Sequence, residues 1–482
     1  MKKRAVIAFL LLSVVTGLRA QEAALSEGQS LLLLSEKSFT RAGIGFYTRS
    51  EDDALFLPEG KSAVQGHFVA SSMQCLDSLH RVEGYVTYEN GVRKGVRFNS
   101  SSDWELLNPF FTVDTVGGDM QKEQYRFYAR YAAETRNFFY GFSVDYRSLQ
   151  EYKTIDPRPR NICADLGASA SAGVMSGNYA ISFEAALRKY NQNSSVTFFD
   201  PRGNNTPIIH YFGFGRYSTR FSGAGNSTSV RFKGFGYSAS VMFEPRSGLG
   251  WIAGSALDRF SVVRHLPGNN ETPISELVKH MFSAYAGKKW TNAYIRADFA
   301  YRIKQGFEYI TDQSSAFNDI GSLMMYSEPA FSGTIKAYWH KRSGSADWEL
   351  FPEAGVLMAK AENLYPGAHM TINQCGTKFA GQVSFPAHDW EIKLRPSIGA
   401  GIPFRCELDD DLVSNALGWH RNYLRHLYDR LNDIVTHGAL VVAVSRSIRK
   451  DMRLFLQAEC SLDYYSSAHS RFIAESTIGV EF

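Results

Sequence analysis

The sequence predicts an all-β protein: a single transmembrane antiparallel β-barrel of about 18 strands (16–18), with long extracellular loops and one loop helix. Three features predict this fold. Apolar and polar residues alternate in many segments of roughly ten residues, which is typical of strands with one lipid-facing and one lumen-facing side. The connections between these segments are alternately short and long. The printed sequence also ends on an amphipathic segment with a terminal aromatic residue, Phe482.

Residues 1–20 have the features of a signal peptide. Lys2, Lys3 and Arg4 form a positive n-region, residues 5–15 are apolar, and Ala20 precedes the expected cleavage site. No later stretch approaches the ~20 apolar residues of a membrane helix, so any membrane crossing is expected to use strands. We expect residues 21–38 to form a short periplasmic segment and residues 39–482 to form the outer-membrane β-barrel.

Composition favours one large β domain over several soluble ones. The chain has 25 Tyr, 34 Phe and 40 Gly but only 15 Pro, and no linker divides it. Its net charge of +4 gives no reason to expect nucleic acid as a partner. The five cysteines form no CxxC motif, so neither a disulfide scaffold nor a zinc site is expected.

Residues 293–304 show the strand pattern most clearly. Odd positions from Ala293 to Ile303 are apolar, and even positions include Arg296, Asp298 and Lys304. The same alternation is found in residues 125–134, 162–174, 179–188, 335–340, 389–405, 454–464 and 471–482. Because the apolar faces are rich in aromatic residues and long enough to cross a bilayer, they are interpreted as lipid-facing.

One segment, residues 229–243, changes parity. Its apolar residues move from Val230 and Phe232 to Phe235 and the following odd positions. We interpret this as a bulge at Gly234 or Gly236, or as a strand that begins only after Gly236.

The lengths of the connections predict which end of each strand faces the periplasm. Long extracellular loops and short periplasmic turns are the outer-membrane arrangement. A strand at 39–49 brings the predicted total to 18, an even number. Short turns are expected near 77–80, 135–137, 176–178, 245–248, 288–292, 344–347, 385–388 and 447–451. Long loops are expected near 93–122, 150–161, 191–227, 265–278, 311–328, 363–369 and 406–434, with a brief one near 466–470.

Charged residues on the polar faces form the predicted lumen wall, and they carry both signs. In an open channel they would create a transverse field that orders polar solutes; in a filled barrel they would form ion pairs that brace it. These residues are Arg126, Arg130, Asp145, Arg147, Arg296, Asp298, Arg302, Lys304, Asp389, Glu391, Lys393, Arg395, Glu459 and Asp463.

Three loop motifs carry a family resemblance. They are DWELLNPFF from Asp103, VGGD followed by Glu123 and Tyr125, and DPRPRN from Asp156. In this order, together with the signal peptide and the terminal Phe482, they resemble a family of Bacteroidota-type outer-membrane β-barrel proteins of unassigned function. The resemblance implies location and fold, and it supplies no catalytic residues.

The DPRPRN motif is predicted to be a stiff loop folded inward. Its two prolines restrict the backbone, and Asp156, Arg158 and Arg160 would pair with lumen charges; a ligand-binding role for the arginines is the alternative. The aromatic loop residues are expected to pack loop against loop, with an apolar or sugar-stacking docking surface as the alternative. They include Trp104, Phe110, Phe111, Phe198, Phe199, Tyr211, Phe212 and Phe214.

Residues 416–435 are the predicted helix, because leucines recur there at helical spacing. This helix would cover the barrel mouth, fold into the lumen or bind a partner helix. His420 and His426 are six positions apart rather than four, so a helical metal pair is not expected.

The sequence gives no enzyme signature. None of the loop histidines lies in a recognisable Ser, His, acid arrangement, so no catalytic, cofactor or metal residues are predicted. We expect an integral outer-membrane protein that acts as a channel for small polar solutes or in nutrient uptake. The alternative is a non-conducting surface scaffold or accessory subunit of a receptor complex. Expected partners are outer-membrane lipid, the barrel-assembly machinery through the C-terminal strand, and another outer-membrane receptor or lipoprotein, but no nucleic acid.

Overall fold

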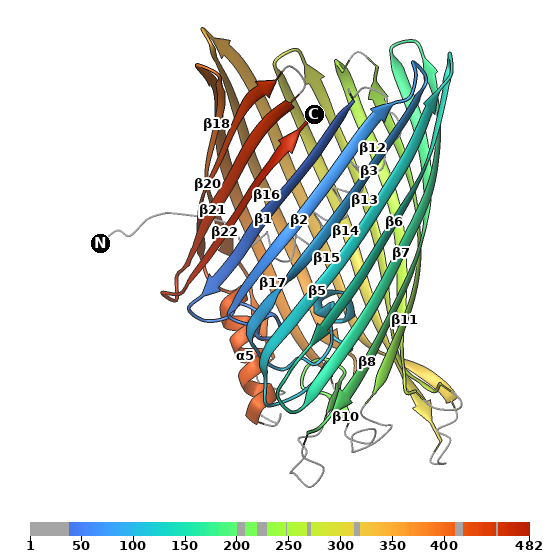
Figure 1. Ribbon diagram of the computed structural model, residues 1–482. Coiled ribbons are helices and arrows are strands. Elements are labelled where there is room, and N and C mark those ends of the chain that lie inside the picture. The colour runs from blue at the N-terminus through green and yellow to red at the C-terminus, as the bar shows by residue number, and fades with distance from the viewer. Residues whose placement is uncertain are drawn as a thin grey trace.

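The structure is a computed structural model that describes residues 38–199, 208–218, 229–246, 248–267, 271–312, 319–365, 367–409, 418–449 and 452–482. The signal-peptide prediction and nearly all of the predicted periplasmic segment lie outside these residues. The described chain forms one closed antiparallel barrel (Figure 1). The sheet contains nineteen strands. The two-residue strand β19 pairs only with β17, on the same edge that pairs with β18, so the ring itself consists of 18 strands. The predicted fold is confirmed.

The ring strands follow one another in chain order. They are β1 (Phe39–Glu51), β2 (Ser62–Cys75), β3 (His80–Val96), β5 (Gly118–Glu134), β6 (Phe138–Tyr152), β7 (Arg158–Ser176), β8 (Tyr179–Thr197), β11 (Val230–Pro245), β12 (Gly250–His265), β13 (Pro273–Trp290), β14 (Ala293–Thr311), β15 (Asp319–Ser343), β16 (Ala346–Asn363), β17 (Ala368–Ala387), β18 (Trp390–Pro403), β20 (Val435–Arg449), β21 (Met452–Tyr465) and β22 (Ser470–Glu481).

The remaining elements lie in the connections. They are the 3-10 helix η1 (Leu57–Glu59), α3 (Trp104–Leu107), β4 (Thr112–Val113), β9 (Ile209–Tyr211), β10 (Tyr217–Ser218), β19 (Glu407–Leu408) and α5 (Gly418–Leu431). The helix predicted at 416–435 is therefore present as α5. In the described part of the chain, no helix combines the length and the hydropathy needed to cross a bilayer.

Pairing of β1 with β22 closes the ring. Ile44 lies opposite Ile478 in this register. Beyond the paired residues, Thr40 and Phe482 exchange two backbone hydrogen bonds of 3.0 and 2.8 Å. The alternation predicted for residues 471–482 therefore belongs to a strand that is paired on both sides, with β21 and with β1.

Short turns and long connections lie at opposite ends of the barrel, as predicted. Figure 1 shows the C-terminus at the end with the short turns, and α5 and β10 at the other end. We call these the periplasmic and the extracellular end, following the arrangement typical of such barrels.

The outward face carries an aromatic belt near the periplasmic turns. Five of the seven tryptophans lie there, and all five are exposed. Such belts are typical of the membrane–water boundary, because the indole ring is apolar with one polar edge. The five residues are Trp251, Trp290, Trp339, Trp348 and Trp390.

The inward face changes character along the strands, and β11 shows how. Val230 and Phe232 are buried inside the barrel, whereas Phe235 and Tyr237 are exposed on its outside. The register of β11 with both neighbours is uninterrupted, so the predicted bulge is wrong. The parity of the apolar residues changes because the extracellular half of the lumen is itself a protein core, in which inward side chains such as Val230 and Phe232 are apolar.

Candidate functional site

The connection between β3 and β5 folds into the barrel and fills its extracellular half. We call residues 97–117, which include α3 and β4, the plug. Leu107, Phe110 and Phe111 of the plug are buried against inward side chains of the wall, among them Phe232 and Phe260. The prediction that the aromatic loop residues pack against one another is therefore confirmed for Trp104, Phe110 and Phe111.

A second inward-folded segment supports the plug. Strands β4, β9 and β10 form a small sheet, so the β8–β11 connection pairs directly with the plug. Arg264 of β12 is buried behind it and donates to the carbonyl oxygens of Phe111 and Tyr211 at 3.0 and 3.2 Å. Its guanidinium lies 4.6 Å from the centre of the Phe212 ring. One wall residue thus holds both inserted segments.

Buried polar contacts fix the plug to the ends of β6 and β7. The side chains of Lys153 and Asp114 are fully buried and form an ion pair of 2.6 Å. Lys153 also donates to the Gly117 carbonyl at 3.1 Å, and Asn161 donates to the Ser100 carbonyl at 3.0 Å. An isolated buried charge is strongly unfavourable, so Lys153 and Asp114 depend on each other.

A bidentate ion pair anchors the start of α3 to the wall. Arg147 of β6 donates to both carboxylate oxygens of Asp103 at 2.8 and 2.7 Å, and the Tyr190 hydroxyl donates to the same carboxylate at 2.9 Å. Burial alone would raise the pKa of Asp103, but the hydrogen bonds from Arg147 outweigh it, so the pKa lies below the ordinary aspartate value.

Helix α5 lies over the plug at the extracellular end. Tyr423 packs on Phe98 of the plug and on Tyr211, with ring centres 5.7 and 6.3 Å apart. His426 donates to the Ala54 carbonyl at 2.6 Å. Of the three roles predicted for this helix, covering the mouth matches its position; the side chain of His420 lies outside the described residues.

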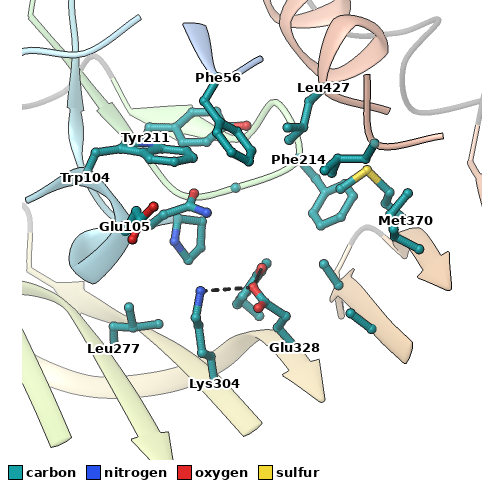
Figure 2. A pocket seen from close by; sticks show the side chains of 18 of the residues that line it. Phe56, Trp104, Glu105, Tyr211, Phe214, Leu277, Lys304, Glu328, Met370 and Leu427 are labelled. Carbon is teal, nitrogen blue, oxygen red and sulfur yellow. Dashed lines mark hydrogen bonds and ion pairs between the residues drawn. The ribbon is translucent and has the colours of Figure 1, made fainter. Parts of the chain in front are cut away.

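Between α5, the plug and the wall lies an apolar pocket with a volume of about 210 Å³. Figure 2 shows Phe56 and Leu427 at one end of it and the neighbouring Lys304 and Glu328 at the opposite end. Most of the lining is aromatic or aliphatic. It includes Phe56, Trp104, Leu106, Pro109, Tyr211, Phe214, Leu277, Met370, Leu424 and Leu427.

The charges at one end of the apolar pocket are neutralised by ion pairs within the barrel wall. Glu328 of β15 pairs with Arg302 at 2.6 Å and with Lys304 at 3.4 Å, and it accepts a hydrogen bond of 2.7 Å from Tyr326. Glu105 of the plug lines the same pocket. Burial, followed by the neighbouring Glu59 carboxylate, raises the pKa of Glu105 to about 7.

On the periplasmic side of the plug lies a polar cavity with a volume of about 1040 Å³. Trp104, Glu105 and Leu106 of α3 line both spaces, so this helix separates the cavity from the apolar pocket. Solvent reaches the cavity wall, since 44% of the Arg126 side chain is exposed. Charged lining residues include Glu83, Arg93, Lys122, Arg126, Arg130, Asp145, Arg147, Asp165, Glu184, Arg188, Asp258 and Lys279.

Most of the predicted wall charges form ion pairs, and most of their partners are neighbours in the wall. Arg126 pairs with Asp145 at 2.6 Å, and Arg130 pairs with Glu83 at 2.8 Å. Arg395 instead lies 4.5 Å from the centre of the Phe351 ring. In the remaining pairs, Asp298 contacts Arg296 at 2.5 Å and Lys336 at 3.2 Å, Glu391 contacts Lys393 at 3.1 Å and Arg453 at 3.4 Å, and Asp463 contacts His437 at 2.7 Å.

Two predictions about charged residues are wrong. Asp389 lies in the β17–β18 turn and pairs with Arg446 at 3.1 Å, so it is not part of the lumen wall. The DPRPRN motif is not an inward loop, because Arg158 begins β7 and Arg160 lies on the exposed face of that strand. Asp156 pairs with Arg158 at 2.8 Å, and Arg160 donates to Gln150 at 3.3 Å, so these charges are satisfied at the rim.

Several site residues were missed by the sequence analysis. Glu328 was assigned to a loop, whereas β15 begins at Asp319 and carries it inward. Asp165 and Arg188 pair at 2.7 Å in the cavity wall, and the alternation of β7 and β8 predicts their inward position. The Lys153–Asp114 pair had no sequence signal, because it joins two connections.

Several solved structures match the chain at low similarity. A variant of the ferric enterobactin receptor PfeA from Pseudomonas aeruginosa is 7% identical, with a TM-score of 0.38 over 92% of this chain and 81% of that chain. The siderophore receptor PirA from Acinetobacter baumannii is 7% identical, with a TM-score of 0.39 over 91% and 80%. BauA, the ferric preacinetobactin receptor from Acinetobacter baumannii, is 8% identical, with a TM-score of 0.39 over 93% and 80%. Similarity at this level carries no information about a ligand.

Sequence comparison gives a family but no function. No curated protein matches the chain. One family model, described as Family of unknown function (DUF6850), matches residues 30–482. The predicted membership of an uncharacterised barrel family is thereby confirmed, and the chain belongs to the family DUF6850.

Proposed function

We propose that this protein resides in an outer membrane and takes up small polar solutes through a lumen that its own plug closes at rest. The plug is the observation that carries the proposal. Barrels of 16 to 18 strands leave an aqueous channel unless loops fill them. Here residues 97–117 fill only the extracellular half, and a solvent-accessible polar cavity remains below them.

The polar cavity supports a polar rather than an apolar solute. Its wall presents both guanidinium and carboxylate groups, for example Arg126 and Asp145, which offer donors and acceptors to hydroxyl, amide or charged groups. Most of these wall charges, Arg126 and Asp145 among them, already form ion pairs, so a solute would exchange hydrogen bonds with those pairs without leaving a buried charge unpaired.

Planar-bilayer conductance of the refolded protein tests the proposal. The intact protein is expected to give almost no current. A variant in which residues 99–116 are replaced by a short Gly-Ser linker is expected to give a steady current. Deletion of residues 418–431 alone is the matched control: it removes α5 but leaves the plug anchored by Arg147 and Lys153, so the current should stay well below that of the plug deletion. A silent plug-deletion variant would refute the channel.

The second candidate is a non-conducting accessory subunit of an outer-membrane receptor complex. The closed extracellular end and the paired wall charges favour it, because both are compatible with a barrel that passes nothing. This candidate gains support if the plug-deletion variant folds, stays silent, and the intact protein copurifies with an outer-membrane receptor or lipoprotein. Neither candidate assigns a chemical reaction to the protein.

A further inference from the structure

Basic residues gather on one part of the outer face of the barrel. Lys189 of β8, Lys233 of β11 and Arg259 of β12 point away from the lumen, since the inward positions beside them, such as Tyr190 and Phe260, are buried. His280 of β13 lies opposite Arg259 and joins them on the same face.

These residues lie within a few positions of one height, as counting from the aromatic residue at the periplasmic end of each strand shows. From Tyr179 to Lys189 the distance is 10 residues (189 − 179), and from Lys233 to Phe243 it is also 10 (243 − 233). For Arg259, counted from Trp251, it is 8 (259 − 251), and for His280, counted from Trp290, it is 10 (290 − 280). A tilted strand crosses the apolar band in about 9 to 11 residues. Lys189, Lys233 and His280 therefore lie at the extracellular boundary of the apolar band, and Arg259 lies two residues further toward the periplasmic end.

The strand register brings the three cations around one aromatic residue. Lys189 lies opposite Phe235, and Phe235 lies opposite Ser261 on the other side. Lys189, Phe235 and Ser261 thus form one row across β8, β11 and β12. Lys233 lies two positions from this row toward the extracellular end, and Arg259 lies two positions from it toward the periplasmic end. Their long side chains can therefore converge over Phe235 and the small Ser261. Phe235 is 51% exposed, which leaves its ring open to the membrane.

The cluster carries an excess of positive charge. Glu271 pairs with both Lys233 and Arg231, so one carboxylate serves two cations. Among the described residues, Lys189 and Arg259 have no ion-pair partner, and Arg259 contacts only the Tyr237 ring, at 6.0 Å.

Among the described residues, four other strands have no basic residue at the corresponding position. Ten residues from the periplasmic end, the outward positions of β7, β14, β16 and β18 are Ala164, Ile303, Met358 and Ala400. Lys360 of β16 is outward-facing near the same level, but it pairs with Glu362 at 2.5 Å.

We propose that Lys189, Lys233 and Arg259 form a binding site for the phosphate groups of a lipid in the outer leaflet. Lysine and arginine bind phosphate through charge-assisted hydrogen bonds, and the boundary of the apolar band is where a lipid headgroup lies. The exposed Phe235, Tyr237 and Leu187 continue below the cations toward the bilayer centre, where they would contact the acyl chains. The apolar contact distinguishes a lipid from free phosphate as the ligand.

Native mass spectrometry of the purified full-length barrel with diphosphorylated lipid A tests the site. The intact protein is expected to retain the lipid, and the double variant Lys189→Gln/Arg259→Gln to bind it with about tenfold or greater loss of affinity, since two charge-assisted contacts are removed. Lys360→Gln is the matched control and should bind like the intact protein. Slower migration of boiled than of unheated protein in a detergent gel verifies that each variant is folded.

Three results would overturn the site: equal binding by the double variant, equal binding of lipid A without its phosphates, or displacement of lipid A by inorganic phosphate at the same concentration. The double variant should not change the current through the plug-deletion barrel, because the cluster lies outside the lumen. The lipid site and the proposed uptake function therefore fail or hold separately.

Discussion

The extracellular and periplasmic halves of the lumen are built from the same strands, but their inward side chains differ in chemistry. In the extracellular half, inward side chains such as Phe232 and Val262 are apolar and buried under the plug. In the periplasmic half, inward side chains such as Arg126 and Asp145 are charged, paired and reached by solvent. What differs is the interior of the barrel, which is filled by protein in one half and is a solvent-accessible cavity in the other.

This difference shows that strand alternation reports what each face contacts, not which face points to the lumen. Along β11 the apolar side changes from inward at Phe232 to outward at Phe235, with no irregularity in the hydrogen bonding. The following substitutions test this difference between the two halves.

The largest effect is expected at the fully buried Lys153–Asp114 pair. Lys153→Met leaves the Asp114 carboxylate buried without its partner and should destabilise the docked plug by roughly 3–5 kcal/mol. Hydrogen exchange of residues 97–117 measures this as faster exchange than in the intact protein. The double variant Lys153→Met/Asp114→Leu removes both charges and should restore much of the protection; if it exchanges as fast as the single variant, charge burial is not the cause.

Loss of packing in the extracellular half should come next. Leu107→Ala removes a fully buried side chain from the plug core and is expected to cost about 2–5 kcal/mol of local stability. The same exchange measurement reports it. Leu76→Ala in the periplasmic β2–β3 turn is the control, because that leucine is 63% exposed and its loss should leave plug exchange unchanged.

Glu105 lies at the border between the two halves, and its ionisation should make the docking of α3 depend on pH. Its pKa is raised from 4.5 to about 7 by burial, so its contribution to docking is present below pH 4.5 and is lost as the pH rises through 7. We expect α3 to exchange faster relative to Glu105→Gln at pH 8 than at pH 5. Comparing the two proteins at each pH cancels the intrinsic pH dependence of exchange. An identical ratio at both values would contradict the prediction.

In the periplasmic half, single charge substitutions should have small effects on stability. Arg126→Gln breaks a solvent-exposed pair with Asp145 and should change stability by less than about 1 kcal/mol. In the plug-deletion barrel it should shift the reversal potential toward cation preference, because a positive charge has left the wall while Asp145 remains. No shift would mean that permeating ions do not pass Arg126.

The smallest effect is expected at the rim. Arg160→Ala removes an exposed side chain on the outer face of β7 and should change stability by no more than about 0.5 kcal/mol. Current through the plug-deletion barrel should also stay the same. A change in conductance would restore the lumen role that the sequence predicted for the DPRPRN motif.

The sequence predicts the barrel well because the alternation of apolar and polar residues is visible within each strand. Residues 293–304 need no distant partner to show which side is apolar. The plug could not be predicted in the same way, because its position depends on contacts between residues far apart in the chain. Arg264 and the Phe111 carbonyl are 153 positions apart, and neither residue alone indicates the contact. Arg147 was assigned correctly to an inward-facing strand side, but its partner Asp103 lies in a loop whose path had no periodic signal.

The closure of the ring between β1 and β22 bears on the order in which the molecule is assembled. The side chains of His67 in β2 and Thr477 in β22, 410 positions apart in the chain, form a hydrogen bond of 3.1 Å that spans β1. Before β22 pairs with β1, the sheet is open at this seam, with a free edge at β1. Residues 97–117 can therefore settle on its concave side while that side is accessible from the edge. A plug that docks before β1 and β22 pair need not be threaded through the mouth of a closed barrel.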